Sequence, residues 1–145
     1  MATIMDLIGH GRVISIDSEP RADRPQHPRL SYWTGSSVDQ EIVAEARKVA
    51  GNGRTMVVLD SDHSATHVLQ EIMSYRELVQ VGDYLIVEDT NINGHPTYSD
   101  FGPGPMEAVE QFLAGTDEFV SDPRCERFLM TCNPKGYLER VRPAR

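Results

Sequence analysis

Positive charge is scarce in this chain. Lysine occurs only at Lys48 and Lys135, and 22 acidic residues outweigh 14 basic ones, so the net charge is −8 over 145 residues. Proteins that bind nucleic acid usually present a basic face to the phosphate backbone. The composition therefore argues against a nucleic-acid partner.

Long hydrophobic runs and cysteine-rich motifs are also missing. No apolar run approaches the roughly 20 residues that a membrane-spanning helix needs, and no basic segment followed by an apolar one resembles a signal peptide. The two cysteines, Cys125 and Cys132, have no metal-binding spacing, which favours two free thiols in a reducing compartment. We expect a cytoplasmic protein with no membrane partner.

Segments of β-rich and helical pattern alternate along the chain. A length of 145 residues suits a single domain, residues 1–145. Alternating strands and amphipathic helices predict an α/β domain with a largely parallel sheet. The expected strands cover residues 12–16, 29–33, 55–60, 84–88, 119–120 and 127–132; the expected helices lie over residues 2–8, between 37 and 51, after residue 64, and from 105 onward.

Two of these helices carry recognisable sequence signals. In the first, Ser37 with Gln40 three residues later resembles a capping box, and glycines at 51 and 53 supply the end. In the other, Pro105 suits the first position of a helix. The loop between residues 90 and 103 is long for a compact domain, which favours a functional role.

Acidic residues follow two of the most apolar strands. Asp60 and Asp62 come directly after Val-Val-Leu, with His63 next, and Glu88 and Asp89 follow Leu-Ile-Val. Carboxylates gathered at neighbouring strand ends repel one another unless something neutralises them. Oxygen ligands favour a hard cation such as Mg²⁺; the alternative is a solvated acidic rim of turn residues.

Polar residues also follow the two earlier strands. Asp17 could accept hydrogen bonds from ribose hydroxyls, or it could cap a turn. The Gly35-Ser36-Ser37 turn could line an adenine pocket with small side chains and backbone amides, or it could begin a helix. Both positions suit a ligand, because ligands of parallel sheets bind beyond the carboxyl ends of the strands.

Histidine offers a candidate base. An unperturbed imidazole titrates near pH 6.5, so His63 could take a proton from a substrate; alternatively it only contacts Asp62 at a helix start. We expect His67 to lie on the surface. His95, in the long loop, could touch a substrate.

Together these motifs resemble a known family. Asp17 after Val-Ile-Ser-Ile, then Tyr-Trp-Thr-Gly-Ser-Ser, Val-Val-Leu-Asp-Ser-Asp-His-Ser and Val-Glu-Asp-Thr-Asn-Ile-Asn-Gly-His-Pro look like the cephalosporin hydroxylase/rhamnosyl O-methyltransferase family. That family consists of class I, S-adenosylmethionine-dependent methyltransferases. The similarity extends from about Met5 to Val141, and the two acidic motifs are its most specific part.

The resemblance implies a fold, cofactors and roles. It implies a Rossmann-like class I methyltransferase sheet, S-adenosylmethionine and Mg²⁺ as cofactors, and a small-molecule hydroxyl acceptor such as a sugar or other secondary metabolite. Asp17, Gly35, Ser36 and Ser37 would bind the cofactor; Asp60, Glu88 and Asp89 would be the metal ligands; His63 would be the catalytic base.

One part of the family pattern is missing. The family carries a strand and a glycine-rich loop upstream of the helix that starts here at Ala2, and the eleven glycines of this chain form no Gly-x-Gly-x-x-Gly. We therefore expect a sheet that is incomplete at its N-terminal side, without the central strand between those that end at Asp17 and Asp60. Unpaired strand edges favour association, so a homo-oligomer is expected as well.

Alternative functions follow from the same residues. A methyltransferase-like subunit without catalysis would complete its sheet with another chain. A metal-dependent phosphohydrolase would use Asp-Ser-Asp but needs a lysine in the site, which Lys48 and Lys135 are poorly placed to supply. An iron oxygenase would need two histidines and a carboxylate on an all-β scaffold, which the alternation of elements disfavours.

Overall fold

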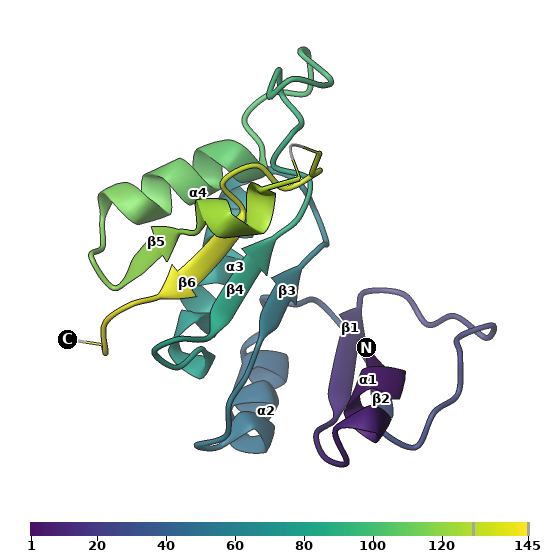
Figure 1. The fold of residues 1–145 in the computed structure, drawn as a ribbon. Coiled ribbons are helices and arrows are strands. Elements are labelled where there is room, and N and C mark those ends of the chain that lie inside the picture. Colours follow the sequence, from purple (N-terminus) through teal and green to yellow (C-terminus); the bar gives the residue numbers. More distant parts are fainter. Residues whose placement is uncertain (129, 145) are drawn as a thin grey trace.

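The computed structural model describes residues 1–128 and 130–144 and has an α/β architecture (Figure 1). The helices are α1 (Ala2–Leu7), α2 (Gln40–Ala50), α3 (Ala65–Tyr75), α4 (Pro105–Ala114) and the short 3₁₀ turns η1 (Arg76–Leu78) and η2 (Pro123–Glu126). The strands are β1 (Val13–Asp17), β2 (Leu30–Thr34), β3 (Val57–Leu59), β4 (Tyr84–Val87), β5 (Phe119–Ser121) and β6 (Tyr137–Arg140). None of the described helices is long and apolar enough to cross a membrane.

The strands form two separate sheets. β1 pairs in parallel with β2, and the other four strands follow the order β3-β4-β6-β5. β3 and β4 are parallel, whereas β6 runs antiparallel to both β4 and β5. The sheet is thus less parallel than the sequence predicts.

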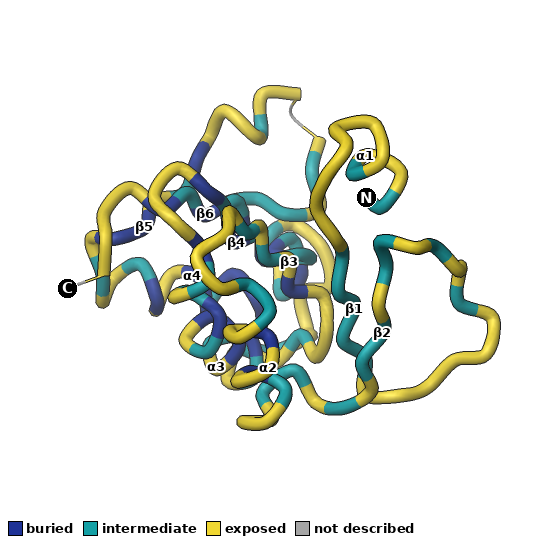
Figure 2. Tube along the Cα trace, turned by 90° about the horizontal axis from the view of Figure 1, so that it is seen from below, coloured by how far each residue is buried: buried dark blue, intermediate teal, exposed yellow. Residues whose placement is uncertain are grey.

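The expected interruption of the sheet is confirmed. Within the described residues β1 pairs only with β2, and β3 pairs only with β4. β1 lies between β2 and β3 in both Figures 1 and 2, so the unpaired edges of β1 and β3 face each other. In Figure 1 the strands β1 to β4 run in the same direction, which places their carboxyl ends at one edge of the molecule.

The hydrophobic core lies in the larger sheet and its helices. Helices α3 and α4 pack against each other, and the fully buried side chains include Ile72, Val79, Leu85, Val109 and Leu138. In Figure 2 the buried segments cluster around α3, α4, β4, β5 and β6, whereas β1, β2 and α1 are half-buried or exposed. Ile16 and Trp33 connect the β1–β2 pair to this core from its margin.

Four local predictions were wrong. The N-cap of α2 is Asp39, whose carboxylate accepts a hydrogen bond from the Glu41 amide, so Ser37 is not the cap. The apolar run of β3 predicts that Val58 is buried, and the helical periodicity of α3 predicts the same for Met73, but both side chains are exposed.

The fourth concerns the last strand. Leu129 lies outside the described residues, and the described residues of 127–132 contain no strand. The strand is β6 instead, where Leu138 points into the core and Glu139 does not.

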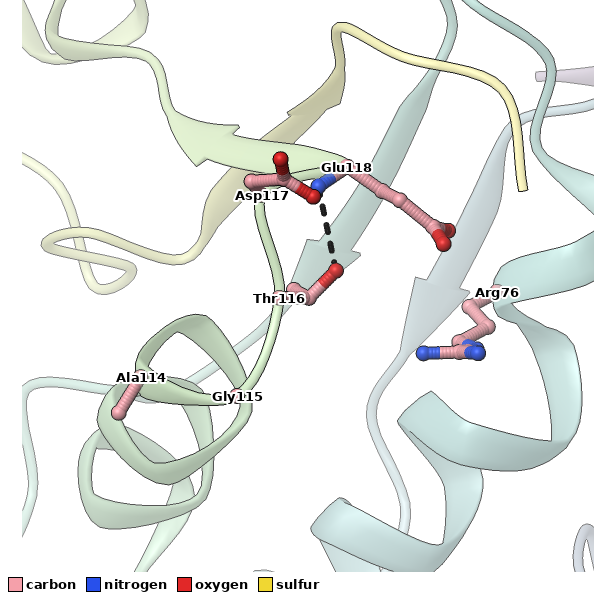
Figure 3. A pocket seen from close by; sticks show the side chains of 6 residues that line it. All are labelled: Arg76, Ala114, Gly115, Thr116, Asp117 and Glu118. Carbon is pink, nitrogen blue, oxygen red and sulfur yellow. Dashed lines mark hydrogen bonds between the residues drawn. The ribbon is translucent and has the colours of Figure 1, made fainter. Parts of the chain in front are cut away.

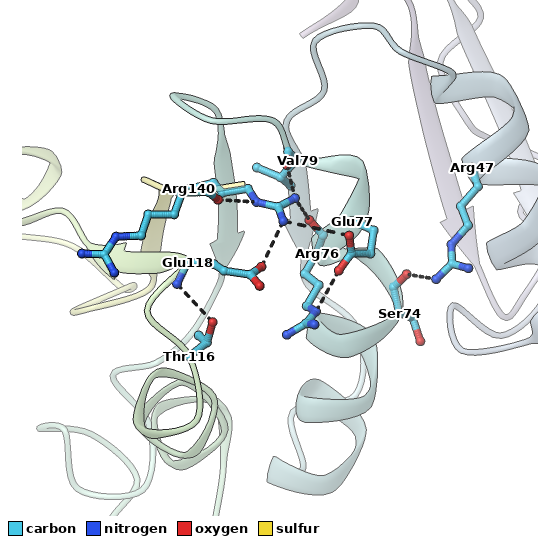
Figure 4. A network of polar contacts seen from close by, with 9 residues as sticks. Arg47, Ser74, Arg76, Glu77, Val79, Thr116, Glu118 and Arg140 are labelled. Atoms are coloured by element: carbon cyan, nitrogen blue, oxygen red, sulfur yellow. Dashed lines mark hydrogen bonds and ion pairs between the residues drawn. The ribbon is translucent and has the colours of Figure 1, made fainter. Parts of the chain in front are cut away.

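A buried ion pair fixes β6 to its neighbours (Figure 4). The Arg140 guanidinium donates to Glu118 Oε2 at 3.0 Å and to the carbonyl oxygen of Val79 at 2.8 Å. It also lies over the Phe119 ring, 5.4 Å from its centroid. This one side chain therefore joins β6, β5 and the segment after η1.

A hollow of about 450 Å³ lies beside this pair (Figure 3). Its lining residues are Arg76 and the segment Ala114, Gly115, Thr116, Asp117 and Glu118. A second hollow of about 480 Å³ lies between α2 and α3 and includes Val43, Arg47 and Ser74. Neither is lined by a residue of the acidic cluster that the sequence predicts.

Candidate active site

Four candidate site residues follow β3 and β4 at the shared carboxyl edge. Asp60 and His63 come after β3, and Glu88 and Asp89 come after β4. The two strands are parallel, with Leu59 opposite Val87, so the residues that follow them emerge side by side. The Glu88 amide donates to the Leu59 carbonyl at 2.9 Å and extends the pairing by one residue. The sheet register therefore brings the two acidic motifs together.

Three side chains converge closely. Ligating atoms of Asp60, His63 and Asp89 all lie within 4.8 Å of one another. His63 Nε2 is 3.2 Å from Asp89 Oδ2 and 3.7 Å from Asp60 Oδ1. Nevertheless, this buried nitrogen has no hydrogen bond of good geometry among the described residues.

Glu88 reports the electrostatics of this cluster. Burial raises the pKa of its carboxyl group above the ordinary value, the negative charges of Asp60 and Asp89 raise it further, and His63 opposes them. The negative charges of Glu88, Asp60 and Asp89 therefore lie close enough to repel one another. A divalent cation would relieve that repulsion, so the residues fit a magnesium ion.

The fourth carboxylate of the predicted cluster has a local partner. Asp62 Oδ1 accepts a hydrogen bond from the Ser64 amide at 2.8 Å, just before α3 begins. Hydrogen bonds from Ser64 lower the pKa of Asp62. Asp62 shapes the turn into α3 and is not among the converging side chains.

The backbone at Asp89 is held in an uncommon conformation. Its φ of 52° lies in the left-handed region, which is unfavourable for most residues other than glycine. The Asp89 amide donates to Asn133 Oδ1 at 2.9 Å, and Thr90 Oγ1 donates to the Pro134 carbonyl at 2.6 Å. At Gly136 a Cβ atom would lie 2.2 Å from the Val87 carbonyl, so the 133–136 turn packs tightly enough to impose this conformation.

The predicted cofactor residues lie at the ends of β1 and β2. Asp17 is opposite Thr34 in the register, and its carbonyl accepts a hydrogen bond from the Gly35 amide at 2.9 Å. Asp17 Oδ2 accepts from Arg24 at 2.8 Å, and Oδ1 accepts from the Glu19 amide. The hydrogen bond from Glu19 and the charge of Arg24 keep the pKa of Asp17 low. Asp17, Gly35 and the two serines are neighbours, but the Asp17 carboxylate already has an arginine partner.

Two other histidines make contacts that the sequence did not predict. His67 is half-buried: its Nε2 lies 3.3 Å from Ser37 Oγ and 3.7 Å from Glu71 Oε1, so its assignment to the surface was wrong. His95 Nε2 lies 2.9 Å from Glu107 Oε1. A substrate contact by His95 stays a prediction.

Glu107 of α4 anchors the long loop. It accepts hydrogen bonds from His95, from Asn93 Nδ2 at 2.9 Å and from the Gly104 amide at 2.7 Å. Burial alone raises the pKa of Glu107, but these hydrogen bonds outweigh it and lower the pKa to about 2. The loop is thereby tied to the first turn of α4.

Comparison with solved structures identifies the fold. The mycinamycin-biosynthesis methyltransferase MycE in complex with Mg and SAH has a TM-score of 0.60 with this chain at 14% identity, over 96% of this chain and 40% of that one. Its complex with Mg, SAH and mycinamycin VI gives 0.61 at 11% identity, over 96% and 39%. The fold is that of a class I methyltransferase.

Sequence comparison gives the family. Residues 1–141 match the model of the rhamnosyl O-methyltransferase/CmcI family, and the chain belongs to that family. It is 40% identical to the rhamnosyl O-methyltransferase of Mycobacterium tuberculosis (strain H37Rv), over 96% of this chain and 60% of the relative. It is 34% identical to that of Mycobacterium leprae, over 96% and 64%. The chain thus spans about three fifths of the length of these relatives.

Proposed function

We propose that the chain acts as a magnesium- and S-adenosylmethionine-dependent O-methyltransferase on a hydroxyl group of a sugar or other secondary metabolite. The observation that carries this proposal is the convergence of Asp60, His63 and Asp89 within 4.8 Å in a chain of the rhamnosyl O-methyltransferase/CmcI family. The structurally similar MycE complex with Mg and SAH supports both cofactors.

The carboxylates and His63 would have different roles. Asp60, Glu88 and Asp89 would hold Mg²⁺, which supplies a positive charge that lowers the pKa of a substrate hydroxyl. His63 Nε2, which makes no hydrogen bond with the residues that the structure describes, would accept the proton of that hydroxyl.

The other end of the site would hold S-adenosylmethionine, the donor of the methyl group. Asp17 would contact the ribose, and Gly35, Ser36 and Ser37 would line the adenine pocket. Because Arg24 occupies the Asp17 carboxylate, ribose binding would require Asp17 to share or release this partner. Holding both reactants in place would provide much of the rate enhancement.

Direct binding and turnover test the proposal together. Calorimetric titration of the full chain with Mg²⁺ and with S-adenosylhomocysteine measures each site, and transfer of labelled methyl from S-adenosylmethionine to a panel of glycosides measures catalysis. We expect Asp60→Asn to abolish Mg²⁺ binding and transfer, and His63→Ala to abolish transfer while Mg²⁺ still binds. Metal-independent transfer by Asp60→Asn would refute the metal assignment.

A second candidate is a methyltransferase-like subunit without catalysis of its own. The facing, unpaired edges of β1 and β3 favour it, because a partner strand could complete the sheet there. Such a subunit would bind Mg²⁺ but transfer no methyl group to any acceptor. A phosphohydrolase is not favoured, because both lysines already have carboxylate partners: Lys48 pairs with Glu45, and Lys135 pairs with Glu110.

A further inference from the structure

Helix α3 carries a polar strip on its buried side. His67, Glu71 and Tyr75 are spaced four residues apart, so they share one face of the helix. Glu71 is 2% exposed and Tyr75 is 4% exposed, although their neighbours Val68 and Ile72 belong to the hydrophobic core. A buried carboxylate in such surroundings is costly unless it is hydrogen-bonded or paired with a charge.

The strip contacts the turn after β2 at two points. His67 Nε2 lies 3.3 Å from Ser37 Oγ, and the Tyr75 hydroxyl donates to the Ser37 carbonyl oxygen at 2.6 Å. Ser37 belongs to the turn that would line the adenine pocket. The strip therefore fixes both the side chain and the backbone of this residue.

The same strip contacts the loop after β3. Ser61 Oγ donates to Glu71 Oε1 at 2.7 Å, and Ser61 immediately follows Asp60, one of the converging carboxylates. Glu71 Oε1 is also 3.7 Å from His67 Nε2. Glu71 Oε1 thus lies between the loop after β3 and His67, the residue that contacts Ser37.

We infer that Glu71 is a positioning residue. It sets the spacing between the loop after β3 (residues 60–64, the metal loop) and the turn after β2 (residues 35–38, the cofactor turn). It does so through Ser61 on one side and His67 on the other. This inference rests on the proposed function, because it gives the two contacted loops the roles assigned to them there. Methyl transfer requires donor and acceptor to be held at reacting distance. The turn and the loop come from strands of two different sheets that are not paired with each other, so side chains of α3 provide the cross-connection.

The first test measures Mn²⁺ affinity of the full chain by calorimetry, well below the midpoint of thermal unfolding. Residues that orient metal ligands typically change affinity 10- to 100-fold, and for Ser61→Ala and Glu71→Leu we expect about tenfold weaker binding. Glu71→Gln should retain most of the affinity, because its amide oxygen can still accept from Ser61.

A buried carboxylate elsewhere provides the control. Glu118 is also buried but pairs with Arg140 beside the start of β4, at the opposite end of that strand from Asp89. Glu118→Gln should lower the free energy of unfolding and leave the Mn²⁺ affinity unchanged. If Ser61→Ala and Glu71→Leu behaved like Glu118→Gln, Glu71 would be merely structural and the inference would be wrong.

The second test follows amide hydrogen exchange without any ligand. We expect Glu71→Leu to accelerate exchange both in residues 35–38 and in residues 60–64, and His67→Leu to accelerate it in residues 35–38. A uniform change over the chain would overturn the inference.

Asp60→Asn in the Mn²⁺ titration separates the two proposals. If Asp60→Asn has no effect on Mn²⁺ affinity, the metal site of the proposed function is wrong. If Asp60→Asn abolishes binding while the Ser61 and Glu71 variants bind normally, only the role of Glu71 is wrong.

Discussion

Glu88 allows the destabilising effect of the acidic site on the metal-free protein to be measured at a single residue. Burial and the charges of Asp60 and Asp89 raise the pKa of this carboxyl group, so its ionised form destabilises the metal-free protein. We expect Glu88→Gln to raise the midpoint of thermal unfolding by a few degrees without metal, and to remove most of the further rise that Mg²⁺ causes in the wild type. Differential scanning calorimetry with EDTA and with Mg²⁺ measures both effects.

The control for Glu88→Gln is Glu45→Gln, an exposed change on α2 whose partner is Lys48. It should alter neither midpoint appreciably, since exposed pairs contribute little. A Glu88→Gln variant that is less stable than wild type in EDTA would show that the carboxylates are not under mutual repulsion.

The lowered pKa of Glu107 predicts that the stability of the protein depends on pH. Hydrogen bonds lower the pKa of Glu107 from the ordinary value of 4.5 to about 2 in the folded protein, so folding favours the ionised form. The resulting stability is fully present above about pH 4.5 and is lost as the pH falls toward 2. Urea unfolding of wild type and Glu107→Gln should therefore show a stability difference that is constant near neutral pH and shrinks below pH 4.5. A difference that does not change with pH would contradict the hydrogen-bonded anchor.

Among the elements, β6 is the one whose attachment to its neighbours depends most clearly on one side chain. Arg140 is buried and bonds Glu118 as well as the carbonyls of Val79 and Arg142. Removing one partner of a buried pair typically costs about 3–5 kcal/mol, and we expect Arg140→Met to destabilise the chain by this amount. Denaturant unfolding measures the change.

A double variant refines that prediction. Arg140→Met with Glu118→Leu removes both charges, so it should recover part of the lost stability. Recovery should stay incomplete because the Val79 carbonyl loses its donor. A double variant less stable than the sum of the two single changes would show that the pair is not the source of the stability.

The elements also show how far sequence reasoning reaches. Apolar runs located β3 and β4, and the acids that follow them predicted the convergence of Asp60 and Asp89, because parallel strands share a carboxyl edge. No comparable pattern marks β6 in the sequence, because Tyr-Leu-Glu-Arg contains a single hydrophobic core residue, Leu138. Glu71 was missed because a carboxylate within a helical apolar stripe is read as an exposed position until its partners, Ser61 and His67, are brought near by folding. The one available hint was its four-residue spacing from His67 and Tyr75.

On the scale of the whole molecule, the two sheets should differ in local stability. β1 and β2 have no fully buried residue, whereas β4 and β6 place Leu85, Val87 and Leu138 in the core. Local opening needs less free energy where less apolar surface is buried. We expect amides of β1 and β2 to exchange with solvent at least about tenfold faster than those of β4 and β6.

The same measurement tests association through the unpaired edges of β1 and β3. A strand from a second copy of this chain would pair with those edges, so raising the protein concentration should slow exchange in residues 13–17 and 57–59 and leave the already protected β6 unchanged. Sedimentation velocity over the same concentrations should show a rise in mass in parallel. If the protein stays monomeric and exchange in both segments is independent of concentration, the facing edges do not mediate self-association, and the proposal of a homo-oligomer through them is wrong.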